Sequence, residues 1–216
     1  MTAPAMKSDL AIGKFSQLLK SHVADPPRVP EDLVDLLVES FMMADATDEQ
    51  GAHAFAKIRK GVVDMNDLRV MLVKEQVSVI GVRYPLAWDR CVLMRRTLMD
   101  VYKREHKMSL ERLRSVAKRE AKAYIEGLAG ITPFVAARTL LLGLDIHAVP
   151  VDQATVDVLE EAEVLHEAGE PVEVAALLTR HVRAEDAAAA HAAIRKATDR
   201  FLASGRVPRL GKKKTR

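Results

Sequence analysis

The stretch GLAGITPFVAARTLLLGLDIHAVPVDQATV, residues 127–156, contains a glycine-bearing turn followed by an apolar helix. Gly127 and Gly130 permit a sharp turn, since glycine adopts backbone conformations that other residues avoid. Thr132 and Pro133 then suit the N-cap and the first position of a helix. The N–H groups at such a turn point outward, so this turn is a candidate for holding a phosphate group.

The same stretch ends near Asp152, which directly follows a Val-Pro-Val segment that cannot continue a helix. At the start of the next helix a carboxylate can accept hydrogen bonds from free N–H groups, so one interpretation is a structural cap. The other interpretation is a catalytic carboxylate, and the local residues leave both open.

Apolar residues recur at helical spacing along most of the chain, which predicts an all-α protein. The only ambiguous strand signal is VSVIGV at 77–82. A helix is expected after the Asp45–Asp48 interruption, and others over residues 8–23, 31–43, 86–106, 109–127, 133–142, 153–168, 171–181 and 185–204.

Charge is segregated along the 216 residues, although the formal net charge is only +3. Residues 90–122 carry eleven Lys/Arg against four Asp/Glu, whereas residues 145–175 carry nine Asp/Glu and no Lys/Arg. The tail GRVPRLGKKKTR, residues 205–216, holds six basic residues. This segregation favours a polyanion partner such as nucleic acid, the alternative being solvated helix faces.

Several classes of protein and site are not expected from this composition. The chain has no apolar run long enough to span a bilayer and no signal-peptide pattern at its start, so we expect a cytoplasmic protein that does not bind membranes. Cys91 is the only cysteine, which excludes an internal disulfide and a four-cysteine iron–sulfur cluster. The seven histidines lack ligand spacing. We therefore expect neither a metal nor a cofactor.

Three segments match, in order and spacing, the motifs of one known family. Leu128-Ala129-Gly130-Ile131-Thr132 resembles a Leu-Pro-Gly-Val-Gly hairpin, Val151-Asp152-Gln153-Ala154 resembles a Val-Asp-[Thr/Gly]-[His/Asn] segment, and Met43–Asp48 resembles Ser-Ala-Gln-[Ala/Thr]-Thr-Asp. From residue 31 to about 204 the chain is thus similar to the helix-hairpin-helix (HhH-GPD) DNA glycosylases of the endonuclease III superfamily, in a divergent form without the iron–sulfur cluster.

This resemblance implies an endonuclease III-like fold of two helical domains. Residues 28–147 would form a six-helix barrel that includes the helix-hairpin-helix motif, and residues 1–27 with 148–204 would form the second domain, followed by the basic tail. The implied partner is double-stranded DNA carrying a damaged or mismatched base, bound by a monomer. In a bacterium the protein would then be associated with the nucleoid.

The resemblance also implies base-excision chemistry with Asp152 as the catalytic carboxylate. Lyase-active relatives carry a lysine 18 residues before this aspartate, where the present chain has Phe134, so the expected activity is that of a monofunctional glycosylase without a lysine-based lyase step. Phe134 would either stack on the flipped base or fill the pocket, and Asp45 stands where relatives place the residue that fills the gap left by that base.

The residues expected to contact DNA are Gly130, Ile131, Thr132, Arg138, Lys212, Lys213 and Lys214. Departures from the family pattern support an alternative, a catalytically degenerate relative that binds DNA or another partner without chemistry. Pro133 lacks an N–H for a phosphate, and Asp45 and Asp157 place negative charge where relatives have neutral or basic residues.

Overall fold

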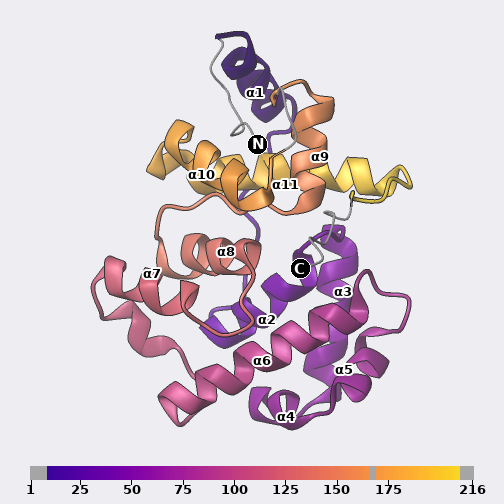
Figure 1. The fold of residues 1–216 in the computed structure, drawn as a ribbon, viewed down its shortest axis with the longest axis vertical. Coiled ribbons are helices and arrows are strands. Elements are labelled where there is room, and N and C mark those ends of the chain that lie inside the picture. The colour runs from indigo at the N-terminus through magenta and orange to yellow at the C-terminus, as the bar shows by residue number, and fades with distance from the viewer. Residues whose placement is uncertain (1–8, 166–168, 210–216) are drawn as a thin grey trace, which may run out of the picture. The chain divides into compact units, whose positions relative to one another are not determined.

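The computed structural model describes residues 9–165 and 169–209, so Lys212, Lys213 and Lys214 lie outside the described residues. Within the described ranges the chain forms eleven α-helices and two short 3-10 helices, without a strand, which confirms the all-α prediction. None of these helices is both long and apolar enough to cross a membrane. The chain divides into two compact units, one of residues Arg28–Ile146 and one of Met1–Pro27 with His147–Arg216 (Figure 1).

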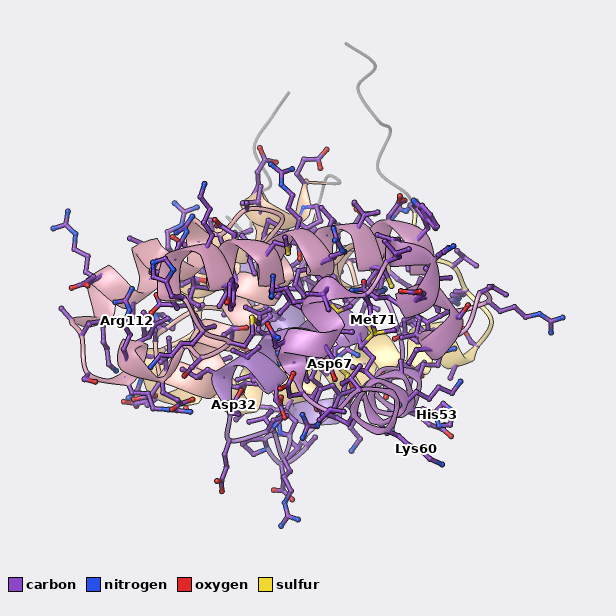
Figure 2. All side chains as sticks on the ribbon, turned by 90° about the horizontal axis from the view of Figure 1, so that it is seen from below. Asp32, His53, Lys60, Asp67, Met71 and Arg112 are labelled. Atoms are coloured by element: carbon purple, nitrogen blue, oxygen red, sulfur yellow. The ribbon has the colours of Figure 1, made fainter. Side chains whose placement is uncertain are left out.

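The unit Arg28–Ile146 is built around helix α2 (Leu33–Met43), which packs against α3, α6 and α8. Its N-cap Asp32, labelled in Figure 2, accepts hydrogen bonds from the N–H groups of Val34 and Asp35. The other elements are α3 (Asp48–Gly61), α4 (Met65–Val70), α5 (Val73–Ile80), α6 (Ala87–Glu105), the 3-10 helix η1 (Glu111–Arg114), α7 (Lys118–Glu126) and α8 (Pro133–Leu144).

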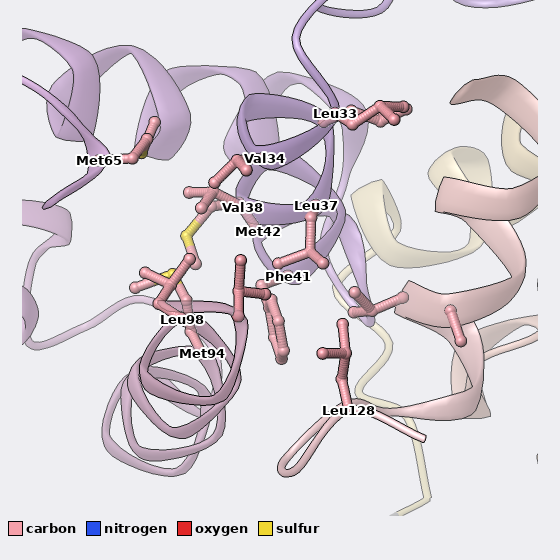
Figure 3. Close-up of a cluster of buried hydrophobic side chains, with 14 of the residues drawn as sticks. Leu33, Val34, Leu37, Val38, Phe41, Met42, Met65, Met94, Leu98 and Leu128 are labelled. Carbon is pink, nitrogen blue, oxygen red and sulfur yellow. The ribbon is translucent and has the colours of Figure 1, made fainter. Parts of the chain in front are cut away.

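Helix α2 is central because it is apolar on nearly every face, and a helix of that kind must be buried. Ten of its eleven residues are buried, and Figure 3 shows its side chains facing Met65, Met94, Leu98 and Leu128 from the surrounding elements. Each fully buried leucine contributes about 1.5–3 kcal/mol relative to an exposed one. The sequence of α2 therefore fixes the centre of this unit.

A glycine allows α8 to approach α2 closely. A Cβ atom placed on Gly143 would lie 2.6 Å from Leu33 Cδ2 and 2.7 Å from Leu36 Cδ2. The contact holds the C-terminal end of α8 against the core of the unit. The hairpin that precedes α8 is thus attached to a rigid element.

The second unit contains α1 (Asp9–Ser21), α9 (Gln153–Glu161), α10 (Pro171–His181), the 3-10 helix η2 (Ala184–Asp186) and α11 (Ala187–Ala203). Helix α11 packs against α1 and α9, and α10 packs against α9. Small buried side chains on α11, among them Ala187, Ala193 and Ala197, allow this close packing.

The predicted helix over 109–127 is wrong, because η1 and α7 are separate elements. The break lets Leu110 and Leu113 enter the core while Arg114 donates hydrogen bonds to the carbonyls of Glu31 and Gly143. The ambiguous segment 77–82 is helical up to Ile80 and ends at Gly81, whose φ is 104°. Helix α4 was not expected.

Helix α9 is shorter than the predicted range 153–168, of which residues 166–168 lie outside the described residues. Glu163 has a φ of 53°, and the N–H groups of Val164 and Leu165 both bond to the carbonyl of Leu159. The chain turns back at this point because Val164 and Leu165 are buried.

Candidate functional site

The turn between α7 and α8 has the geometry of a hairpin that requires glycine. Gly130 has a φ of 85°, and a Cβ atom there would lie 2.7 Å from the carbonyl oxygen of Leu93 and 3.0 Å from Cβ of Arg96. Both the backbone conformation and the close approach to α6 therefore exclude a side chain. The hairpin is pressed directly against α6.

Two side chains of α6 attach this hairpin by hydrogen bonds. Asp100 Oδ2 accepts from the N–H of Ala129 at 2.8 Å, and Arg104 Nη2 donates to the carbonyl of Gly127 at 2.6 Å. Asp100 and Arg104 also form an ion pair of 2.7 Å. Burial acts to raise the pKa of Asp100, but the Ala129 hydrogen bond and the Arg104 guanidinium outweigh it, so the pKa lies below its ordinary value. The ionised carboxylate stabilises the hairpin.

Some of the backbone N–H groups of the hairpin have hydrogen-bond acceptors within the part of the protein that the structure describes, and others do not. The Ile131 N–H bonds to the carbonyl of Leu128, and the Ala129 N–H is taken by Asp100. Among the described residues, no acceptor is found for the backbone N–H of Gly130 or of Thr132. These two N–H groups are therefore the hairpin donors that remain for a ligand.

Helix α8 begins as the sequence predicts, with Thr132 as N-cap and Pro133 in the first turn. Thr132 Oγ1 accepts from the Val135 N–H at 3.4 Å. Phe134 is only 3% exposed and belongs to the hydrophobic core of its unit. This placement favours the interpretation that Phe134 fills space over the one in which it stacks on a base.

The side chain of Arg138 is also buried within its unit. Its Nη2 lies 2.9 Å from Glu39 Oε2, its Nη1 donates to Ser40 Oγ at 2.9 Å, and its side chain is 4% exposed. A guanidinium in this position ties α8 to α2 and is not on a surface that DNA reaches. We therefore leave Arg138 out of the proposed DNA contacts.

Asp152 is the N-cap of α9, and both of its carboxylate oxygens have partners. Oδ1 accepts from the Thr155 N–H at 2.9 Å and from Thr155 Oγ1 at 2.6 Å. Oδ2 lies 3.4 Å from Nη1 of Arg195 on α11, and the two side chains are 2% and 5% exposed. Arg195 also lies 3.7 Å from Asp199. Asp152 is thus a helix cap and, in addition, half of a buried ion pair.

Asp45 lies in a rigid turn after α2, where its φ is 48°. Two side chains donate hydrogen bonds to carbonyl groups just before this turn: Tyr84 donates to Met42 in α2, and Arg90 donates to Phe41 in α2 and to the C-cap Ala44. Thr47 then begins α3 with a reciprocal capping box to Gln50. Asp45 itself is partly exposed. Its backbone position is therefore fixed by the fold.

Comparison with known proteins gives a clear structural match. An endonuclease III–DNA covalent intermediate matches with a TM-score of 0.64 at 14% identity, covering 89% of this chain and 84% of that chain. The chain has the fold of the helix-hairpin-helix DNA glycosylases. The 8-oxoguanine glycosylase/lyase of Clostridium acetobutylicum bound to DNA matches with a TM-score of 0.60 at 14% identity, covering 93% and 70%. A thermostable thymine-DNA glycosylase matches with a TM-score of 0.56 at 15% identity, covering 88% and 85%. No protein-family model matches, and no curated protein matches in sequence.

Within this glycosylase fold, the basic stretch 90–122 has a mostly structural role. Arg90 is buried and bonds to backbone carbonyls of the α2 turn, and Arg95 donates to the carbonyl of Met71 at 2.9 Å. Arg112 pairs with Glu105, and Lys118 pairs with Asp145. Arg90 and Arg95 thus bond to backbone within the unit, whereas Arg112 and Lys118 form ion pairs at its surface.

The acidic helix α9 binds the start of the basic tail. Asp157 accepts from the backbone N–H of Arg209 at 2.8 Å and from Arg209 Nε at 3.1 Å, and Glu160 also pairs with Arg209. Glu161 pairs with Arg206, which lies over the ring of Phe201. The tail thus follows α9 from Glu161 toward Asp157, in the direction of the helix N-terminus.

The sequence did not point to Arg195, Asp100 or Arg104 as part of the candidate site. Arg195 is a charged residue on the buried face of an alanine-rich helix, and only the fold shows that it meets Asp152. The i,i+4 spacing of Asp100 and Arg104 predicts their mutual pairing but not their contacts with the hairpin. No group of His, Cys, Asp and Glu side chains suited to a metal ion occurs within residues 9–165 and 169–209.

Proposed function

We propose that this protein binds duplex DNA and, as a monofunctional glycosylase, hydrolyses the N-glycosidic bond of a damaged or mismatched base with Asp152 as the catalytic carboxylate. The observation that carries the proposal is the buried pair of Asp152 and Arg195. A helix cap needs one oxygen, which Oδ1 provides to Thr155, whereas Oδ2 faces a guanidinium at 3.4 Å. Burying such a pair gains little stability, so the arrangement supports a role in fixing the position of an ionised carboxylate.

A fixed anion suits the chemistry of N-glycosidic hydrolysis. As the bond to the base lengthens, the sugar acquires positive charge, and a pre-positioned carboxylate stabilises it without reorganising. The same carboxylate then helps to activate the attacking water. Phe134 has no amine, so no Schiff base forms at that position and the strand is not cleaved by a lyase step. The base must leave the duplex stack to reach the site.

Contact with DNA is proposed for the hairpin and for the basic tail. The N–H groups of Gly130 and Thr132 are oriented by a turn that Asp100 and Arg104 hold, and Ile131 lies between them. Such N–H groups bind phosphate oxygens. Lys212, Lys213 and Lys214 add positive charge in the tail.

The first test measures base release from duplex oligonucleotides carrying oxidised, alkylated, deaminated or mismatched bases, with hot alkali to cleave abasic sites. The wild-type protein should release one class of base. Asp152→Asn alone removes a buried carboxylate that faces the buried guanidinium of Arg195, which destabilises the protein. The double variant Asp152→Asn/Arg195→Gln removes both charges and keeps a capping side chain, so it should fold and bind DNA but release no base. Base release by this double variant would exclude the carboxylate mechanism.

A second candidate is a protein of the same fold that binds DNA without chemistry. The observation in its favour is that both oxygens of Asp152 are engaged and its side chain is 2% exposed. Duplex binding without release of any base in the panel would support this candidate.

The contribution of the basic tail to DNA binding is measured by the salt dependence of the affinity for duplex DNA. Arg206 and Arg209 pair with α9, which leaves four basic residues among 210–216. At roughly 0.9 per phosphate contact, deleting 210–216 should lower the slope of log K against log salt by up to about 3.5. An unchanged slope would remove Lys212, Lys213 and Lys214 from the proposed interface.

A further inference from the structure

Helix α6 carries an exposed apolar stripe along one face. Trp88, Val92, Met99 and Tyr102 follow one another at spacings of four, seven and three residues, which places them on one side of a helix. They are 57%, 39%, 41% and 38% exposed. The adjoining face of α6, with Cys91, Met94, Leu98 and Val101, is fully buried in the core. Exposed apolar side chains therefore extend from the buried face of α6 onto its solvent-exposed surface.

The segment that joins α4 to α5 is attached to α6 by a hydrogen bond and carries further exposed apolar residues. Arg95 Nε donates to the carbonyl of Met71, which lies beside α6 in Figure 2. The residues on either side, Val70 and Leu72, are 53% and 52% exposed. Six large apolar side chains thus belong to α6 and the segment joined to it. Exposed apolar groups gathered in this way mark interaction surfaces, and Trp, Tyr and Met are enriched there.

Positive charge borders the stripe on both sides. Arg69 lies 3.9 Å over the ring of Tyr102, and Lys103 and Arg96 project from the other flank. Arg69, Arg96, Met99, Tyr102, Lys103 and His106 line a hollow of about 570 Å³ together with Asp100. Asp100 is already bound to Arg104 and Ala129, and Asp89 stands on the same side of the helix. The border therefore carries an excess of cations.

We infer that this surface, which we call the α6 stripe, docks an acidic amphipathic helix of a partner protein. Apolar side chains at helical spacing suit the apolar face of a second helix, and the basic border suits acidic residues beside that face. Single-stranded nucleic acid fits less well, because Val92 and Met99 offer no ring for a base to stack on and Arg69 covers the ring of Tyr102. The stripe belongs to the unit Arg28–Ile146 and Asp152 to the other unit, and the inference does not depend on base-excision activity.

Trp88 provides a direct readout, since it is the only tryptophan in the chain. The probe is a synthetic helical peptide of about 18 residues with Leu at the i, i+3, i+4 and i+7 positions and Glu elsewhere. A peptide with Lys in place of Glu and a scrambled acidic peptide serve as controls. The acidic amphipathic peptide should shift Trp88 emission to shorter wavelength and bind more weakly as salt is raised, and neither control peptide should do so.

Matched variants locate the binding surface. Met99→Glu places a carboxylate within reach of Arg69 and inside the stripe, so it should fold and weaken the peptide at least about tenfold. Val92→Glu provides a second, independent change. Val63→Glu is the control, because Val63 is 90% exposed in the same unit but belongs to the segment between α3 and α4 and not to the stripe. The affinity of this variant for the peptide should match that of the wild type. Lys103→Glu should weaken binding about two- to fivefold.

Three results would overturn the inference. The first is that the acidic peptide does not bind at the stripe, either because it does not bind at all or because Met99→Glu and Val92→Glu leave its binding intact. The second is binding of a single-stranded oligothymidine that shifts Trp88 while the peptide does not. The third is a concentration-dependent dimer in sedimentation that Met99→Glu dissociates, since the stripe would then join two copies of this chain. Duplex DNA binding by Met99→Glu should equal that of the wild type in every case, which separates this test from the proposed function.

Discussion

The first turns of α8 and α9 are capped in the same way, but the residues near the two capping side chains differ. Thr132 and Asp152 each accept a hydrogen bond from the N–H three residues later, at 3.4 Å and 2.9 Å. Two residues after Thr132, Phe134 is buried in the hydrophobic core of its unit. Asp152 instead faces the guanidinium of Arg195. Capping alone therefore says nothing about function, and the second contact, a buried ion pair that is costly to form, distinguishes Asp152 from Thr132.

The largest expected effect is at the α9 start. Arg195→Met removes the guanidinium that faces the buried Asp152 carboxylate, which should lower the free energy of unfolding by about 3–5 kcal/mol. Chemical denaturation followed by circular dichroism measures this loss. In the double variant Arg195→Met/Asp152→Asn most of the stability should return, because the buried carboxylate is gone as well. A double variant no more stable than Arg195→Met would show that the pair is not coupled.

The next effect concerns the hairpin before α8. Gly130→Ala places a Cβ atom 2.7 Å from the Leu93 carbonyl in a backbone conformation with φ of 85°. We expect a loss of about 2 kcal/mol or more in unfolding free energy. Gly205→Ala also has a positive φ but meets no atom within 4 Å, so it should cost less. Equal losses at the two sites would mean that contact with α6 does not restrain the hairpin.

A smaller effect depends on pH and on Asp100. Its folded-state pKa lies below the ordinary value of 3.8, so its contribution is present above that pH and disappears as the pH falls through the folded-state value. At neutral pH, Asp100→Asn should cost about 1–2 kcal/mol, since solvent screens the partly exposed Arg104. The variant should also lose less stability on acidification than the wild type. Glu105, whose pKa is lowered chiefly by Arg112, still titrates in both proteins. Parallel pH profiles would contradict the prediction.

The smallest effect is at the α8 cap. Thr132→Ala removes one hydrogen bond and should cost about 1 kcal/mol, with thermal unfolding as the measurement. Thr132→Ser keeps the hydroxyl and should cost little. A loss as large as that of Arg195→Met would remove the distinction between the two helix starts.

Sequence reasoning predicted the starts of α8 and α9 well because the signals for them are local. Proline and glycine restrict the backbone at their own positions, and a cap acts within one helical turn. The same reasoning failed for residues 109–127, where burial of Leu110 and Leu113 breaks an otherwise helical segment. It also assigned Arg138 to a surface, because the charge of a residue does not reveal a partner such as Glu39 on another helix.

The amino-acid sequence alone was enough to predict the all-α class, the apolar helix α2, the hairpin glycine and the position of Asp152 at a helix start. Each of these follows from backbone restriction or hydrophobic periodicity, which act over a few residues. The fold, in contrast, determines which charged side chains meet. It pairs Asp152 with Arg195 across 43 residues, fastens the hairpin to Asp100, and ties arginines of the basic stretch to backbone carbonyls while leaving the α6 stripe exposed. These pairings depend on long-range packing, because a charged side chain is stable inside a protein only where the fold brings it a partner.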